Sequence, residues 1–267
     1  SVMIAVPTGK AALARDTVFA AVMIVCNGIV GLCLLWGGAR HHEQGFQLRG
    51  ASAALAVLAA LTILTLVLPN VATTTPGPYF STSQLVFAGI ISLLLYGSFV
   101  FVQTVRHRDY FLAKDAGNEG AHASPPSNKT AVVSLGILLA ALVAIVGLAK
   151  ALTPMVEIGV ASLGASEAVV GIVIAALVLL PEGLAALRAA QANRLQTSLN
   201  LALGSALASI GLTIPTVAAV SIVLQKPLEL GRGSKDQVLL ALTLIVGVIT
   251  LGTGRTTVLQ GIVHLVI

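Results

Sequence analysis

The sequence is poor in charged and aromatic residues: 9% of its 267 residues are Asp, Glu, Lys or Arg, and 4% are Phe, Trp or Tyr. A soluble globular domain carries about 25% charged residues, so this composition excludes a water-soluble fold. Apolar residues make up 57% of the chain, and the mean hydropathy is +0.98. The sequence therefore predicts an all-α polytopic membrane protein, whose main partner is the lipid bilayer.

Other absences narrow the function. The only cysteines, Cys26 and Cys33, share one apolar segment, where helix packing explains them better than a disulfide. A net charge of +5 would indicate a nucleic-acid partner in a soluble chain, but the basic residues lie between apolar segments, so no nucleic-acid partner is expected. The chain has neither an HExxH motif nor a paired-Asp GxGD motif, so we expect neither an enzyme nor a resident cofactor.

Long apolar runs alternate with short polar links. Membrane helices are predicted over about 17–37, 51–68, 84–105, 131–152, 168–187, 197–223 and 237–251, with a last one that begins near Thr256. The polar stretch 106–130 contains glycines, serines and two adjacent prolines and predicts a linker between a first membrane unit, 1–105, and a second, 131–267. Alternating links carry nine Lys and Arg residues on the linker's side and six on the other. The positive-inside rule then places the linker in the cytoplasm, with the bacterial inner membrane as the expected location.

An internal repeat relates the two units. Residues 16–32 align with 196–212 and share Thr, Gly and Leu at equivalent places, and residues 87–95 align with 259–267. An odd number of spans in each half would insert the copies with opposite topology, as in many secondary transporters. We expect two inverted repeats of about five helices, the first incomplete, in a chain truncated at both ends.

Glu182 is the residue around which the functional hypothesis is built. It follows an unbroken apolar run, 168–180, and is followed by further apolar residues. An ionised side chain at bilayer depth costs about 2.5–3.5 kcal/mol on insertion scales, and such residues mark ion or proton paths. Pro181 precedes it and leaves one backbone carbonyl of the preceding turn without its usual donor. Both residues are candidate ligands for a transported cation.

Other polar residues in apolar segments are weaker candidates. Asn200, Ser205 and Ser209 could supply oxygen ligands from the next helix, or they could simply pack helices or bond backbone carbonyls. Asn27 could line a cavity or form an interhelical hydrogen bond. Glu167 could begin a proton or cation pathway, or it could be a helix N-terminal acid favoured by the helix dipole.

Two stretches resemble a known family. The run VVGIVIAALVLLPEGLAALRAAQANRLQTSLNLALGSALASIGLTIP resembles the second repeat motif of calcium/proton antiporters in the cation/Ca²⁺ exchanger superfamily, in particular the bacterial ChaA-type branch. DTVFAAVMIVCNGIVGLCLL resembles the segment that follows the first motif. The resemblance implies one glutamate from each repeat at the membrane midplane, binding cations and protons in exchange. Glu182 matches the second of these, and the first has no match in these residues. Many relatives carry Gly-Asn-Ala-Ala where this chain has VLLP.

The residues and the resemblance together predict a secondary active transporter. It would exchange Ca²⁺, or alternatively Na⁺ or K⁺, for H⁺ at Glu182, because a buried carboxylate can hold either a proton or a cation. The alternative is a non-transporting membrane subunit that needs a partner chain to supply the second acid. The transported ions are the expected small-molecule partners, and a homo-oligomer is left open.

Overall fold

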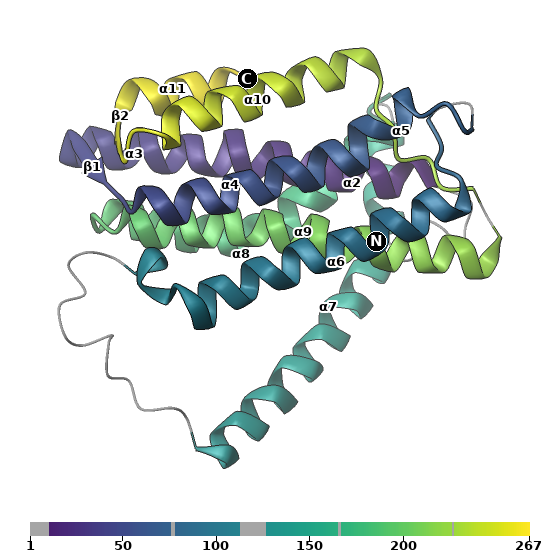
Figure 1. Cartoon of the computed structure of the whole chain (residues 1–267), viewed down its shortest axis with the longest axis horizontal. Helices are drawn as coiled ribbons and strands as arrows, with labels where there is room; N and C mark the ends of the chain where they lie inside the picture. The colour runs from purple at the N-terminus through teal and green to yellow at the C-terminus, as the bar shows by residue number, and fades with distance from the viewer. Residues whose placement is uncertain (1–10, 76–77, 113–126, 165–166, 226) are drawn as a thin grey trace.

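The chain folds into a bundle of long helices (Figure 1). The computed structural model describes residues 11–75, 78–112, 127–164, 167–225 and 227–267. The first half comprises α2 (Ala11–Met23), η1 (Ile24–Ile29), α3 (Val30–His41), β1 (Glu43–Gly45), α4 (Leu48–Thr62), η2 (Ile63–Val67), α5 (Leu68–Val71), α6 (Thr82–Phe101), η3 (Val102–Arg106) and η4 (Arg108–Phe111). The second half comprises α7 (Asn128–Ser162), α8 (Glu167–Gln191), α9 (Leu195–Leu224), α10 (Ser234–Leu251), β2 (Arg255–Thr257) and α11 (Val258–Val266).

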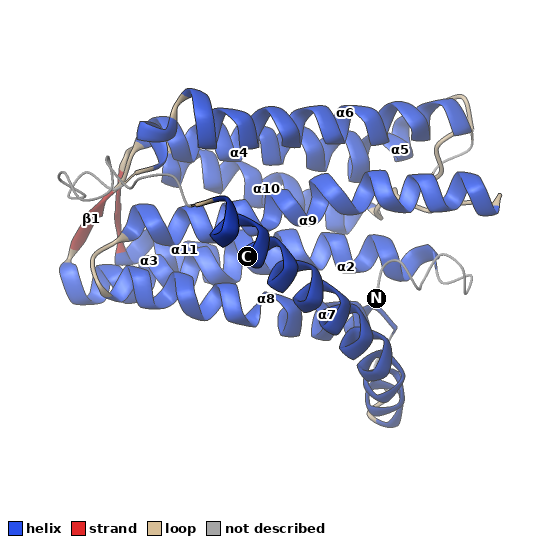
Figure 2. Ribbon diagram, turned by 90° about the horizontal axis from the view of Figure 1, so that it is seen from below, coloured by secondary structure: helices blue, strands red, loops and turns tan. Residues whose placement is uncertain are grey.

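The predicted membrane helices are confirmed. Within the described residues, seven helices are long and apolar enough to cross a membrane, and α11 forms where the last span was expected. Helices dominate Figure 2, and the short strands β1 and β2 join two links that the sequence placed on the same side. The largest difference concerns α7, which continues to Ser162. The span predicted over 131–152 is therefore too short, because Pro154 does not end the helix, and Glu157 lies inside α7.

Two long helices form the centre of the bundle and run antiparallel. One is the continuous rod α2–η1–α3, in which η1 is a π-helical turn, and the other is α9. At one end Gln44 in β1, just after α3, donates a hydrogen bond to the carbonyl of Ala190 in the last turn of α8, close to where α9 begins. At the other end Arg15 in α2 donates to the carbonyl of Gly231, which follows α9. These two helices carry the aligned segments 16–32 and 196–212, so their opposite directions are what inverted repeats require.

Each central helix packs on the last helix of the other half. Gly31 in α3 faces α11, since a Cβ built on it would lie 2.9 Å from Leu265, and Gly261 of α11 lies against the backbone of α3 at Leu35. Gly211, the repeat equivalent of Gly31, faces α6, with Tyr96 2.7 Å from the same built position. Small residues allow helices to approach closely in a membrane. The packing therefore follows the predicted repeat, with the two halves interlocked.

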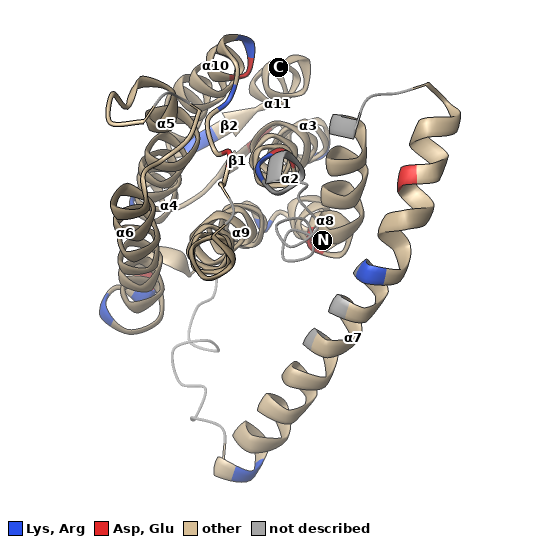
Figure 3. Ribbon diagram, turned by 90° about the vertical axis from the view of Figure 1, so that its right-hand side faces the viewer, with Lys and Arg blue, Asp and Glu red and all other residues tan. Residues whose placement is uncertain are grey.

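The remaining helices surround this centre unequally. In the end view of Figure 3, α4 and α6 lie on one side of α9 and α2, α8 lies on the other, and α7 stands apart from the bundle. Most described side chains of α7 are exposed, and its C-terminal turns contact α8 near the buried Val160. Most of the charged residues in this view lie toward helix ends. α8, which carries Glu182, is thus placed directly beside the central pair.

Candidate functional site in helix α8

Glu182 lies on the buried face of α8. Ala175, Leu179 and Ala186 are 2%, 3% and 0% exposed, and spacings of four, three and four residues put Glu182 on the same face of the helix. The Oε2 atom is buried and has no hydrogen-bond partner. It is the only carboxylate oxygen among the described side chains with this combination. A buried acceptor that nothing satisfies costs about 1–3 kcal/mol, and more when it is charged.

Glu182 lies midway between the two ends at which the central helices are joined. α8 contacts α2 near its start, where a Cβ built on Gly171 would be 3.4 Å from Asp16. At its other end the carbonyl of Gln191 lies 2.9 Å from His41 Nε2. At 1.5 Å rise per residue, Glu182 is about 16 Å from the level of Gly171 and about 14 Å from that of Gln191. The carboxyl group is therefore at mid-depth in the bundle.

The helix rise also places the other candidates relative to this level. α8 and α9 form an antiparallel pair joined at Asn193. Glu182 and Gly204 are equally distant from Asn193 in the sequence, so they lie at the same level along the pair. Ser205 of α9 therefore shares the level of Glu182, whereas Ser209 lies about 7 Å to one side of it and Asn200 about 6 Å to the other. Both serine residues are half-buried. Ser205 is thus the best placed of the three.

Asn200 makes structural hydrogen bonds. Its Nδ2 donates to the carbonyl of Phe111 at 2.5 Å, and its Oδ1 accepts from Gln196 Nε2 at 2.9 Å. These bonds fasten the short helix η4, at the start of the 106–130 link, to α9. The amide of Asn200 is therefore already partnered in this conformation, and its role as a cation ligand stays a prediction.

Asn27 lies in the π-helical turn η1, close to the level of Glu182. A Cβ built on Gly183 would be 3.3 Å from Ile29, so Asn27 is within about 3 Å of that level along the helix axis. Its Nδ2 donates to Thr243 Oγ1 on α10 at 2.8 Å, whereas its Oδ1 is buried without a partner. The interhelical hydrogen bond left open by the sequence is present, and one oxygen remains unused.

The turn that carries Asn27 is itself unusual. The segment Ile24–Ile29 is π-helical between two α-helical segments of the same rod. Single π-helical turns of this kind frequently occur at functional sites. No pattern in the sequence signalled this turn or pointed to Thr243 as the partner of Asn27.

The last two candidates are less well positioned. Pro181 is exposed, so its ring faces away from the buried side of α8; what it contributes is an unpaired carbonyl at Leu177, four residues earlier. Glu167 is the first residue of α8, and its side chain lies outside the described residues. The part of the chain that the structure describes holds no group of three or more His, Cys, Asp and Glu residues suited to a metal ion.

Comparisons with known proteins agree on the type of molecule. The family model described as "Sodium/calcium exchanger protein" matches residues 1–105 and 133–267. The chain is 55% identical over 268 residues to "Putative ionic transporter y4hA" of Sinorhizobium fredii (strain NBRC 101917 / NGR234), covering 100% of this chain and 72% of that protein. It is 35% identical over 263 residues to "Sodium-potassium/proton antiporter ChaA" of Escherichia coli (strain K12), covering 97% and 71%.

Two solved structures share the fold. Native YfkE superposes with a TM-score of 0.74 at 20% identity, covering 99% of this chain and 75% of that one. The H⁺/Ca²⁺ exchanger CAX superposes with a TM-score of 0.70 at 16% identity, covering 99% and 66%. At these identities the likeness establishes the fold.

Proposed function

Because the chain belongs to the sodium/calcium exchanger protein family, we propose that it is an integral membrane transporter that exchanges a cation for H⁺ at Glu182. The observation that carries the proposal is the buried, unpartnered Oε2 of a carboxyl group at mid-depth in the bundle. Such an oxygen is satisfied by a proton on the carboxyl group or by a bound cation, and it cannot hold both at once. Competition for one atom couples the two ions.

Neighbouring oxygens extend the proposed site. Ser205 and the unpartnered Oδ1 of Asn27 lie near the level of Glu182, whereas the carbonyl that Pro181 frees lies on the exposed side of the same helix. Hydroxyl, amide and carbonyl oxygens are the neutral ligands that hard cations prefer. We propose Ca²⁺ as the cation, with Na⁺ and K⁺ as alternatives. The relatives support both choices, because one is described as a sodium-potassium/proton antiporter and one fold neighbour as an H⁺/Ca²⁺ exchanger.

Coupled transport also requires that the site open to one side of the membrane at a time. Glu182 is about equally far from the two joined ends of the bundle, so either end could give access to it. The proposed location is the bacterial inner membrane, with the 106–130 link in the cytoplasm. Outward cation movement would then be driven by inward proton movement.

The test compares Glu182→Gln with the native sequence in the natural full-length protein that contains this chain. In everted vesicles with an acidified lumen, Ca²⁺, Na⁺ or K⁺ added outside should release protons from the lumen through the native protein, as followed by acridine orange fluorescence. The Gln variant should show no release above empty vesicles, because its amide cannot exchange a proton. Glu157→Gln in α7 is the matched control and should retain exchange.

Retained exchange in Glu182→Gln would refute the proposal. Absence of exchange in the native protein, with a second acid-bearing chain found in the purified material, would favour the alternative of a subunit that needs a partner. The three cations in parallel assays also decide the substrate class.

A further inference from the structure

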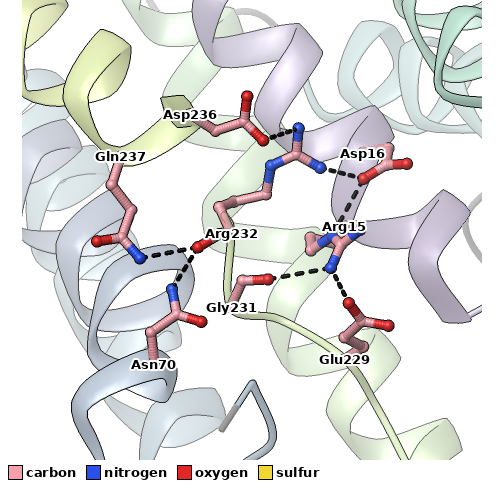
Figure 4. Close-up of polar contacts among 8 residues, drawn as sticks. All are labelled: Arg15, Asp16, Asn70, Glu229, Gly231, Arg232, Asp236 and Gln237. Carbon is pink, nitrogen blue, oxygen red and sulfur yellow. Dashed lines mark hydrogen bonds and ion pairs between the residues drawn. The ribbon is translucent and has the colours of Figure 1, made fainter. Parts of the chain in front are cut away.

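A cluster of charged residues closes one end of the bundle. Figure 4 shows Arg15 and Asp16 from α2 beside Glu229 and Arg232 from the link after α9, with Asp236 at the start of α10. The side chains of the two arginines are 14% and 11% exposed. Largely buried charges interact more strongly than exposed ones. The exchange mechanism proposed above does not involve these residues.

Arg232 is the centre of this cluster. Its guanidinium pairs with Asp16 and, at 2.7 Å, with Asp236, and it stacks 4.3 Å from the ring centroid of Phe19. Its backbone carbonyl accepts a hydrogen bond from Asn70 Nδ2 at 2.7 Å, and its backbone N–H donates to the carbonyl of Leu66 at 3.2 Å. One residue of a link thus holds α2, η2, α5 and α10 together.

Arg15 forms a second connection between the same elements. Its guanidinium donates to the carboxylate of Glu229 and, at 3.0 Å, to the carbonyl of Gly231. Its Nε also pairs with Asp16 at 3.0 Å. Asp16 therefore forms ion pairs with both arginines. The link after α9 cannot separate from α2 unless these pairs break.

The position of the cluster connects it with Glu182. Asp16 is also the residue against which Gly171 packs, so the cluster lies at the entrance to the interface between α2 and α8. Glu182 lies on that side of α8, about 16 Å further along. We infer that this cluster, defined as Arg15, Asp16, Glu229, Arg232 and Asp236, is an ionic gate that closes the access to Glu182 from its end of the membrane. Arg232 is then a positioning residue of the exchange, and the inference rests on the proposed function.

A thiol-accessibility measurement tests the gate without measuring transport. In the full-length protein with Cys26→Ala and Cys33→Ala, Ala175→Cys places a reporter on the buried face of α8 between Asp16 and Glu182. Thr73→Cys, an exposed position in the link after α5 at the same end, identifies the membrane face from which a membrane-impermeant thiol reagent is added. The reporter at 175 should react slowly in the otherwise native protein.

Opening the gate should expose the reporter. Arg232→Gln should raise its reaction rate about tenfold, whereas Arg255→Gln, whose side chain is 73% exposed at the opposite end, should leave the rate unchanged. Arg232→Lys, which keeps the positive charge beside Asp16 and Asp236, should leave the rate closer to the native value than Arg232→Gln does. A purely structural role would not give side-specific exposure or rescue by the charge-conserving variant.

An unchanged rate in Arg232→Gln, with normal labelling at position 73 and a monodisperse protein, would overturn the inference. If that variant does not reach the membrane, Asp236→Asn removes one of the Arg232 pairs and should raise the rate about threefold; an unchanged rate there has the same meaning. The labelling assay involves no ion transport, so its outcome is separate from that of the exchange assay. If Arg232→Gln raises the labelling rate as expected but Glu182→Gln still exchanges ions, only the proposed function is refuted.

Discussion

Replacing Glu182 by Gln should abolish stabilisation by the transported cation while making the protein itself no less stable. The change keeps the shape of the side chain and replaces a carboxyl group whose Oε2 has no partner by a neutral amide. An unsatisfied buried polar atom costs about 1–3 kcal/mol, and more when it is charged. The variant should therefore unfold at a higher temperature than native protein whose Oε2 holds neither a cation nor a proton, by about 2 °C or more for a chain of this size.

The cation should reverse this order. A ligand that binds only the folded state stabilises it by about 2.7 kcal/mol at one hundred times its dissociation constant. The native protein should gain that amount on titration with the transported ion, and the Gln variant should gain nothing. Thermal unfolding in detergent, monitored by the loss of monodisperse protein on size-exclusion chromatography across a cation series, measures both effects.

Two results would contradict the reasoning. A Gln variant that is markedly less stable than the native protein without cations would mean that the carboxylate has a stabilising partner. Equal cation-dependent stabilisation of both proteins would mean that the ion binds elsewhere. Glu157→Gln is again the control, and its stabilisation by the cation should match that of the native protein.

Two further predictions concern helix packing. Gly261→Val should destabilise the protein by about 1–3 kcal/mol or more, because its side chain would meet the backbone of α3, whereas Gly97→Val, with open space around it, should cost much less; equal unfolding temperatures for the two variants would contradict the close approach of α3 and α11. Thr243→Val should cost about 1–3 kcal/mol by leaving Asn27 Nδ2 without its acceptor. Adding Asn27→Leu should recover part of that loss, and a double variant less stable than Thr243→Val would show that Asn27 contributes through other contacts.

Features that depend on the local solvent were predictable from the sequence. A helix must cross the bilayer wherever an apolar run is long enough, because lipid offers its backbone no hydrogen bonds. This constraint allowed the membrane helices to be located from the sequence. It also singled out Glu182 as an ionisable residue within an apolar span. The alternation of links was also correct, since β1 and β2, separated by more than two hundred residues, meet at one end.

Features that depend on partners distant in sequence were not predictable. The sequence left it open whether Asn27 is a cation ligand or forms an interhelical hydrogen bond, and only the fold places Thr243 of α10 next to it. Asn200 was a candidate ligand by residue type, but its amide donates to the carbonyl of Phe111 in η4. Arg15 lies just before the span predicted over 17–37, and its pairing with Glu229 depends on how α9 ends. In each case the residue type indicated that the side chain would form a polar contact, but the sequence could not identify the partner.

The two ends of the bundle are joined by different chemistry, although the helices between them are related by the repeat. In the centre, Gly31 on α11 and Gly211 on α6 give each half an equivalent contact with the other. At the β1 end, neutral hydrogen bonds from Gln44 hold β1 to the last turn of α8 and to the turn before α9. At the opposite end, largely buried ion pairs of Arg15 and Arg232 hold α2 to the link after α9. Equivalent central contacts favour neither access direction, so under the proposed gate the difference between the ends decides which one rests closed. Because these arginines lie outside or at the edge of the repeated segments, we expect that the resting direction can change without any change at Glu182.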